Sequence, residues 1–191
     1  MATDQDGTDS RLAARLKAER EGRGWSLAEL AARAGVSKAM ISKLERGESS
    51  PTAALLGRLS GAFGLTLSQL LARAEAIAGP LARKAEQASW RDPATGFTRR
   101  TLTPTSGAPT PLELVSGELP PGAAIAYPAS AYSFIQDQQI VVIAGALRFT
   151  QGERVYELAT GDCLRLGPPA ACEFRNDGHA LCRYIVAVLR R

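Results

Sequence analysis

The feature that most constrains this chain is a pair of short helices marked out by capping residues between positions 24 and 51. Ser26 and Glu29 have the Ser-x-x-Glu spacing of a capping box, which satisfies the free N–H groups at a helix start. Gly35 can end that helix, because glycine adopts the left-handed conformation at little cost. Ser37 then caps a second helix, predicted over residues 38–45. Local rules therefore predict two helices joined by one tight turn.

The second helix is expected to bury one face and to present a polar, basic face to solvent. Ile41 and Leu44 have the spacing of inward positions, and Gly47 is expected to end the helix. The outward positions carry polar or basic side chains: Lys38, Ser42, Lys43 and Arg46. A rigid helix of this kind, with such side chains at its exposed end, suits the major groove of DNA.

The stretch AARAGVSKAMISKLERG, residues 31–47, resembles the helix-turn-helix of the xenobiotic-response-element-type, phage-repressor-like regulators, and the resemblance spans residues 10–71. It implies double-stranded DNA as a partner. By their match to the recognition helix, four residues would lie at base edges: Lys38, Ala39, Ser42 and Lys43. Phosphates would be contacted by Ser37, Met40, Arg46 and the helix start at Ser26. An ordinary helical hairpin, or an antitoxin-like module that binds a protein, remains the alternative.

The positive charge of the chain is concentrated in this same segment. Residues 10–50 carry nine basic and five acidic side chains, a net +4, while the other 14 basic and 14 acidic residues cancel. No apolar run approaches the ~20 residues of a membrane helix. The start, MATDQDGTDS, is polar and acidic, unlike a signal peptide. We expect a cytoplasmic protein with no membrane partner, whose cysteines stay reduced: Cys163, Cys172 and Cys182.

The pattern along the chain predicts two domains. Residues 1–9 are expected to be a disordered leader, and residues 10–76 a five-helix domain with its first helix over 11–23 and its last over 67–76. Residues 77–96 are expected to be a linker, followed by a β-rich domain over 97–191. Strands are predicted over 112–115, 123–127, 132–134, 140–143, 146–149, 154–158, 163–166, 172–174 and 181–189. Many short strands between turn residues indicate an antiparallel sandwich or barrel.

The segment from Gln138 to Gly178 resembles the cupin family, through Ile140–Gly145, the Gly161-Asp162 pair, the Gly167-Pro168-Pro169 turn and Asn176. This resemblance implies a small jelly-roll barrel. The whole arrangement is similar to regulators that fuse a repressor-type helix-turn-helix to a cupin sensor. That similarity implies a transcription regulator, with repression favoured, that acts as a homodimer and reads two half-sites related by a dyad.

The resemblance to cupins raises the question of a metal site. Metal-binding cupins use two His and a Glu on one strand and a third His later, and the matching positions here are Tyr132, Phe134, Gln138 and Cys172. The chain has one histidine, His179, so these ligands cannot be assembled. We therefore expect no metal, no cofactor and no enzyme activity. A barrel enzyme with a targeting helical domain is the alternative.

The barrel interior could still bind a small organic effector. Alternation along one strand predicts that even-numbered residues from Tyr132 to Val142 share a face. The expected pocket residues are Tyr132, Phe134, Gln138, Ile140, Cys172, Phe174 and Tyr184. An apolar cavity with a phenol, an amide and a thiol suits such a ligand. The alternative is that these side chains simply fill a small barrel.

Overall fold

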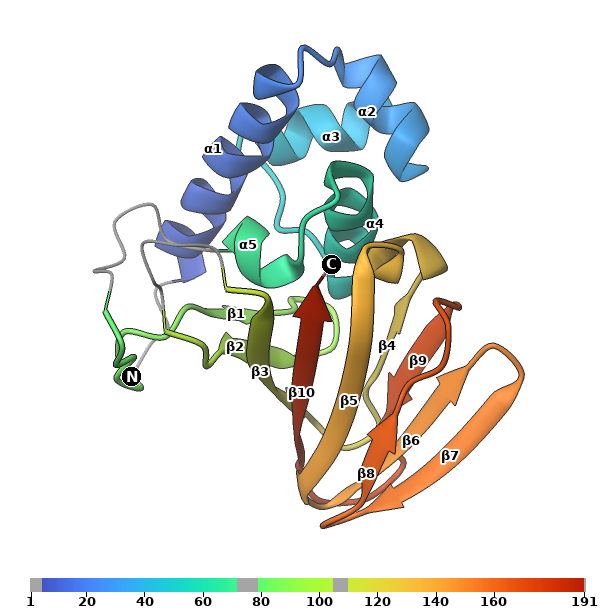
Figure 1. Ribbon diagram of the computed structural model, residues 1–191. Coiled ribbons are helices and arrows are strands. Elements are labelled where there is room, and N and C mark those ends of the chain that lie inside the picture. The colour runs from blue at the N-terminus through green and yellow to red at the C-terminus, as the bar shows by residue number, and fades with distance from the viewer. Residues whose placement is uncertain (1–4, 72–78, 105–109, 191) are drawn as a thin grey trace.

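The computed structural model describes residues 5–71, 79–104 and 110–190. Five helices come first in the chain, and they lie together above a β-rich part (Figure 1). Their bounds are α1 (Gln5–Gly22), α2 (Leu27–Ala34), α3 (Lys38–Glu45), α4 (Ala53–Phe63) and α5 (Leu67–Leu71). Within the described ranges, no helix is both long enough and apolar enough to cross a bilayer.

The first helix begins at Gln5, inside the segment expected to be a disordered leader. The Ser50 hydroxyl donates a hydrogen bond to the carboxylate of Asp9, which ties this end of α1 to the loop before α4. The helix predicted to run to residue 76 is described only as far as Leu71, because the rest of it lies outside the described residues. Residues 79–88, part of the expected linker, contain a turn and no helix.

The capping signals around α2 and α3 are confirmed. The Ser26 hydroxyl accepts a hydrogen bond from the Glu29 amide at 3.2 Å, and the Glu29 carboxylate accepts one from the Ser26 amide at 2.7 Å. Gly35 ends α2 with a φ of 63°. The Ser37 hydroxyl caps α3 by accepting from the Met40 amide at 3.2 Å. These caps satisfy amides that the helix itself leaves unpaired.

The β-rich part consists of two antiparallel sheets that face each other. One sheet has the order β1-β2-β3-β10-β5-β8 and the other β4-β9-β6-β7. Their bounds are β1 (Ser89–Arg91), β2 (Thr98–Thr101), β3 (Leu112–Leu119), β4 (Ala124–Tyr127), β5 (Ile135–Ala144), β6 (Ala146–Gln151), β7 (Arg154–Ala159), β8 (Cys163–Arg165), β9 (Cys172–Arg175) and β10 (Cys182–Arg190). Inner side chains from both sheets fill the space between them, as in a jelly roll.

The strand predicted over residues 132–134 is wrong. The chain forms a short 3-10 helix there, η1 (Ala129–Tyr132), before β5 starts at Ile135. As a result Tyr132 does not belong to the alternating pattern of β5. Gln138 and Val142 are buried on the inner face as predicted, but Gln136 is exposed. The segment prefers a strand locally, but it forms η1 because it packs against α4.

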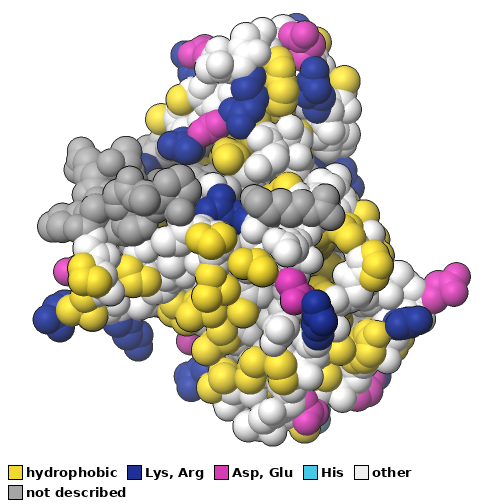
Figure 2. Space-filling view, viewed as in Figure 1, with side chains coloured by type: hydrophobic (Ala, Val, Ile, Leu, Met, Phe, Trp, Pro, Cys, Tyr) yellow, Lys and Arg dark blue, Asp and Glu magenta, His cyan; other side chains and the backbone are white. Residues whose placement is uncertain are grey.

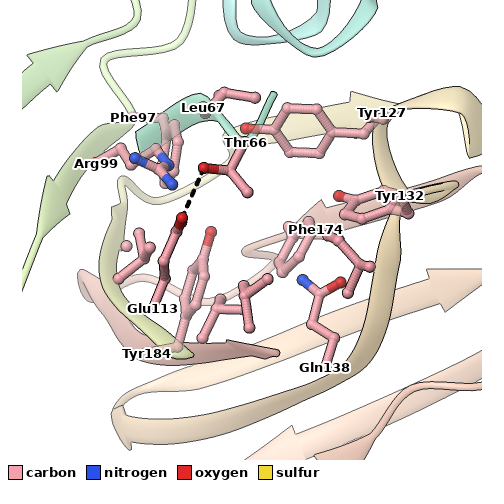
Figure 3. Close-up of a pocket in the computed structure, with 16 residues that line it drawn as sticks. Thr66, Leu67, Phe97, Arg99, Glu113, Tyr127, Tyr132, Gln138, Phe174 and Tyr184 are labelled. Atoms are coloured by element: carbon pink, nitrogen blue, oxygen red, sulfur yellow. Dashed lines mark hydrogen bonds between the residues drawn. The ribbon is translucent and has the colours of Figure 1, made fainter. Parts of the chain in front are cut away.

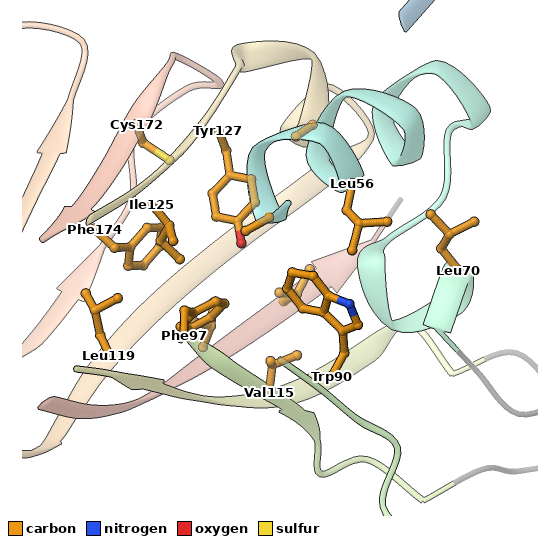
Figure 4. Close-up of a cluster of buried hydrophobic side chains, with 14 of the residues drawn as sticks. Leu56, Leu70, Trp90, Phe97, Val115, Leu119, Ile125, Tyr127, Cys172 and Phe174 are labelled. Atoms are coloured by element: carbon orange, nitrogen blue, oxygen red, sulfur yellow. The ribbon is translucent and has the colours of Figure 1, made fainter. Parts of the chain in front are cut away.

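The helical and β-rich parts share one hydrophobic core instead of meeting through a free linker. Trp90, on β1, is 2% exposed and belongs to the same buried cluster as Leu56 of α4 and Val115 of β3. Figure 4 shows its indole between the helices and the barrel side chains. The hairpin of β1 and β2 lies within and beside the segment expected to be the linker, and the strand predictions missed both of its strands.

Helix α4 approaches the barrel closely because it presents glycines to it. A Cβ atom on Gly57 would lie 2.6 Å from Cδ1 of Tyr127, and one on Gly61 would lie 2.7 Å from the backbone oxygen of Ser130. Neither contact leaves room for a side chain. The two glycines therefore set the distance between α4 and the segment formed by β4 and η1.

Candidate functional site

The surface expected to read DNA is formed by α3 and the start of α2. Ile41 and Leu44 are buried against the other helices, so α3 is fixed in place by its apolar face. The predicted contact residues Ser26, Ser37, Lys38, Ala39, Met40, Lys43 and Arg46 are exposed, and Ser42 is half-buried. Neither Lys38 nor Lys43 forms a hydrogen bond or a close ion pair with another described residue. Both ammonium groups are thus available to an external anion.

Arg46, at the end of α3, has partners within the chain. Its guanidinium donates two hydrogen bonds to the carboxylate of Glu48, at 2.6 and 2.7 Å, and another to the Ser42 hydroxyl. The hydrogen bonds from Arg46 lower the pKa of Glu48, and the same bonds raise the pKa of Arg46. A phosphate contact by Arg46 would have to compete with Glu48, so Arg46 is less free than the two lysines.

A partly buried ion pair holds α3 against α1. The Arg20 guanidinium donates to both carboxylate oxygens of Glu45, at 2.7 and 2.8 Å, and also to the backbone oxygen of Trp25 at 2.9 Å. The hydrogen bond to Glu45 raises the pKa of Arg20. This bidentate geometry fixes the angle of α3 as well as its position. Sequence analysis did not identify Arg20 in this role.

A cavity of about 80 Å³ lies between the barrel and α5. Thr66 and Leu67, at the start of α5, form part of its wall, so both parts of the chain line it (Figure 3). The rest of the wall is mainly apolar or aromatic: Phe97, Val115, Gly117, Tyr127, Ala131, Tyr132, Ile135, Phe174, Tyr184, Val186 and Val188. Its volume is several times the roughly 10–15 Å³ that one water needs, which suits a small organic molecule.

Polar side chains gather at the end of the cavity nearest α5. The Thr66 hydroxyl donates to Oε1 of Glu113 at 3.0 Å, and Nε of Arg190 lies 3.2 Å from the same oxygen. Arg99 donates through Nη2 to the Ser68 hydroxyl at 2.8 Å. Burial lowers the pKa of Arg99, and nearby Tyr127 and Glu113 partly offset this effect. A guanidinium nevertheless remains protonated in a protein.

Three tyrosines in the wall are held in their neutral form. Burial raises the pKa of Tyr127, Tyr132 and Tyr184. The Tyr132 hydroxyl lies 3.2 Å from Sγ of Cys172, and burial raises the pKa of that thiol to about 11. The cavity wall thus offers neutral phenols, which can donate hydrogen bonds to a ligand.

The predicted effector residues are only partly brought together. Tyr132, Gln138, Phe174 and Tyr184 line the inner cavity. Tyr132 and Gln138 also line a second, open cleft of about 530 Å³, together with Cys172. Ile140 is fully buried in the core, and Phe134 is half-buried and lines neither space. Phe134 was predicted to follow the alternation of a strand, but it lies between η1 and β5 and does not join this site.

The positions that match the metal ligands of cupins do not form a metal site in the described part of the chain. No group of three or more His, Cys, Asp or Glu side chains suited to holding a metal ion occurs among those residues. His179 is exposed in the loop between β9 and β10. The residues at the matching positions are a phenol, a phenyl ring, an amide and a thiol. A phenyl ring offers no donor atom, and a single thiol does not supply the three or four ligands of such a site.

The HTH_3 helix-turn-helix family matches residues 16–70, from within α1 to α5. The chain carries a helix-turn-helix domain of the xenobiotic-response-element type. This domain is 45% identical over 60 residues to the HTH-type transcriptional regulator SutR of Escherichia coli (strain K12). That match covers 31% of the chain and 34% of SutR, so it spans only a minor part of either protein.

The helix-turn-helix domain and the barrel together resemble the solved structure of a transcriptional regulator along almost the whole chain. It is the crystal structure of an HTH_3 family transcriptional regulator from Vibrio cholerae, with a TM-score of 0.79 and 25% identity over 98% of this chain and 99% of that one. The cupin_2 domain of an XRE family transcriptional regulator from Enterobacter cloacae also matches, with a TM-score of 0.44 and 17% identity over 50% of this chain and 97% of that one. The predicted fold class is confirmed in its architecture, a five-helix domain followed by an antiparallel jelly-roll barrel.

Several residues around the cavity were not predicted. Phe97 and Arg99 lie on or beside β2, which the strand predictions omitted, and Glu113 lies at the start of β3. The signal that could have found Arg99 and Glu113 is a charged residue at a strand position whose neighbours alternate between inward and outward. Each of the two residues occupies a buried position of its own strand. Buried charges on inner faces indicate a polar site within a barrel.

Proposed function

We propose that the protein is a sequence-specific DNA-binding transcription regulator that acts in the cytoplasm as a homodimer. The observation that carries this proposal is the pair of lysines Lys38 and Lys43, which form no hydrogen bond or close ion pair with a described residue. They lie on the exposed face of α3, a helix that the Ser37 cap and the Arg20–Glu45 pair hold in place. In the bound state α3 lies in the major groove. Base edges are contacted by four residues of α3: Lys38, Ala39, Ser42 and Lys43. The phosphates are contacted by Ser26, Ser37, Met40 and Arg46.

The proposed dimer is supported by an apolar surface on the outer face of the six-stranded sheet. Leu112 and Leu114 of β3 and Ile143 of β5 are 49%, 38% and 49% exposed. Beside them lie the outward residues of β10, where Ile185 pairs with Val141 in register. Figure 2 shows hydrophobic side chains gathered over this face of the molecule. A protein that binds two DNA half-sites needs two copies of its helix-turn-helix, so we propose that a second copy of this chain covers this face.

Regulation by an effector is the second part of the proposal. The cavity between the barrel and α5 is the place where a small molecule would contact both domains at once. Suppose that the helices can take two positions relative to the barrel, of which one binds DNA better. A ligand can then change the affinity for DNA only as far as it binds one of these two states more tightly than the other. Repression, relieved or imposed by this ligand, is the mode that the resemblance favours.

Selection of genomic fragments by the purified protein, followed by footprinting, tests the DNA assignment. We expect a protected dyad with half-sites about one helical turn apart. The charge-reversed variant Lys38→Glu/Lys43→Glu should lose this protection. For this variant, the slope of log affinity against log salt concentration should become shallower by about one unit for each phosphate that is no longer neutralised.

Lys17→Glu is the matched control, because Lys17 is an exposed lysine on α1, which is not one of the proposed reading elements. It should leave both the footprint and the salt slope nearly unchanged. If the double variant on α3 binds as well as the wild type, α3 is not the reading element. The domain would then fit the alternative of a protein-binding module.

The enzyme alternative makes a different prediction. A catalytic cupin would bind iron, manganese or zinc in a fixed ratio, whereas we propose that this barrel is not an enzyme. Metal analysis of protein purified without chelator separates the two cases. A stoichiometric metal would contradict the proposal and would place the ligands outside the residues described above.

A further inference from the structure

The charges around the inner cavity do not cancel. Glu113 has Arg190 as its ion-pair partner and also accepts from Thr66. Arg99 is 9% exposed, and within the described chain its hydrogen-bond partners are two neutral hydroxyls, Ser68 at 2.8 Å and Thr101 at 3.4 Å. No carboxylate of the described residues lies within ion-pair distance of it. A buried guanidinium is costly when the carboxylate near it, here Glu113, is already paired with another arginine, and this indicates that an anion completes the site.

The wall next to this guanidinium is suited to an apolar body. Phe97, Phe174 and Tyr184 stack on one another, with ring centroids 6.5 Å apart for Phe97 and Tyr184 and 5.3 Å apart for Phe174 and Tyr184. Gln138 points into the cavity from β5 (Figure 3) and is 8% exposed. The end of the space near α5 thus holds Arg99 beside the Glu113–Arg190 ion pair and has a net positive charge, while its sides are aromatic and carry one amide.

We propose that this cavity binds a small organic monoanion, a carboxylate on a short apolar or aromatic body. The carboxylate accepts charge-assisted hydrogen bonds from Arg99, and the body packs against Phe97, Phe174 and Tyr184. This inference rests on the effector role proposed above and adds the chemical class of the ligand. An amine of the same shape would meet an unpaired positive charge, so the site discriminates against it.

The same arginine connects the ligand to the DNA-binding half. Arg99 lies on β2 of the barrel, and Ser68, its partner, lies on α5 of the helical domain. A carboxylate that binds Arg99 shares its guanidinium with the hydroxyl of Ser68. Binding would thereby alter the contact that holds α5 against the barrel, and α5 packs on both α1 and α4.

The test is a thermal-unfolding titration of the full chain, without DNA, in a chloride buffer free of carboxylates. The probes are short aliphatic acids and benzoate, each compared with its own primary amide and with the amine of the same skeleton. We expect at least one acid to raise the unfolding temperature in a saturable manner. Its amide and amine should bind at least about tenfold more weakly, as expected when a hydrogen bond to a charged group is removed.

Arg99→Met should abolish the shift, and Arg99→Lys should retain part of it. Arg100→Met is the control, since Arg100 is the next residue on β2 and points to the other face, where it donates to the Lys84 backbone. If Arg99→Met does not fold, the comparison of each acid with its amide on the wild-type protein still tests the proposed anion site.

Equal binding of acid and amide, or no saturable shift with any acid, would overturn the proposal. Because the titration contains no DNA, its result is independent of the footprint. A failed footprint with a positive titration would refute the DNA assignment and leave the anion site in place.

Discussion

The carboxylate of Asp92, in the turn between β1 and β2, accepts a hydrogen bond from the backbone amide of Ala53 at 3.1 Å. Ala53 is the first residue of α4, and Asp92 is only 2% exposed. A residue of the barrel thus caps a helix of the DNA-binding domain, where a negative charge also interacts favourably with the helix dipole. The two domains are joined by a directed polar contact in addition to apolar packing.

Replacing this cap should therefore destabilise the whole protein. We expect Asp92→Ala to lower the free energy of unfolding by about 2 kcal/mol, the magnitude for removing a buried hydrogen bond to a charged group. Asp177→Ala is the control, because Asp177 is exposed, and it should stay within about 0.5 kcal/mol of the wild type. Urea unfolding followed by circular dichroism measures both. A small effect at Asp92 would show that apolar packing alone holds the domains together.

The glycines of α4 provide a second prediction. Gly61→Ala would place a methyl group against the backbone of Ser130, and rigid backbone cannot move aside as a flexible side chain can. We expect a net loss of about 1 kcal/mol or more, because overpacking outweighs the gain in helix propensity. Gly22→Ala has open space around its Cβ and should be neutral or slightly stabilising. Thermal unfolding of the two variants compares them directly, and equal stability would argue against close packing at Ser130.

The pair of Arg20 and Glu45 should matter far more than the pair of Arg46 and Glu48. The side chains of Arg20 and Glu45 are 12% and 7% exposed, so Glu45→Ala leaves the partly buried Arg20 with only the exposed carboxylate of Glu21 as an ion-pair partner. We expect a loss of about 3 kcal/mol, the lower end for a broken buried pair. Glu48→Ala removes an exposed partner and should change stability little. If both variants were equally stable, the buried pair would not be what positions α3.

Thiol reactivity should separate the three cysteines. Burial raises the pKa of Cys172 to about 11 and that of Cys182 to about 11, so both stay protonated at pH 8. The thiolate is the reactive form, and Cys163 is exposed. We expect a disulfide reagent to modify Cys163 in the native protein at pH 8, and the other two only on unfolding or as the pH approaches 11. Rapid reaction of a second thiol would contradict this assignment.

The outer face of the six-stranded sheet can be tested by its effect on assembly. Leu114→Lys should dissociate the proposed dimer, because it places a charge within an apolar interface. Val155→Lys is the matched control, since Val155 is also apolar and is 57% exposed but lies on the other sheet. Sedimentation equilibrium reports the masses. A monomeric wild type, or a dimer insensitive to Leu114→Lys, would exclude this face as the interface.

The helix-turn-helix could be predicted from sequence because its signals are local. The cap at Ser26, the left-handed Gly35 and the cap at Ser37 each act within a few residues, and the structure has all three. The order of the later strands was accessible for the same reason, since turns and short apolar runs alternate along the chain.

The junction could not be predicted, because its signals are distant in sequence. Trp90, Asp92 and Arg99 belong to a stretch that has no regular pattern, and their roles depend on partners at Leu56, Ala53 and Ser68. Tyr132 was placed on a strand because alternation was extended through a segment that η1 interrupts. The alternation was correct from Gln138 onward, where β10 and β8 flank β5 on both sides.

The cavity wall that Thr66 and Leu67 contribute has a consequence for how such proteins can be recombined. A chimera that joins this barrel to the helices of another regulator would lack the matching wall, the serine that meets Arg99 and the glycines that admit Tyr127 and Ser130. Its sensing half would therefore be altered even though none of its own residues had changed. If α3 reads DNA as proposed, a new DNA specificity is better introduced by changing α3 within its own domain than by exchanging the domain.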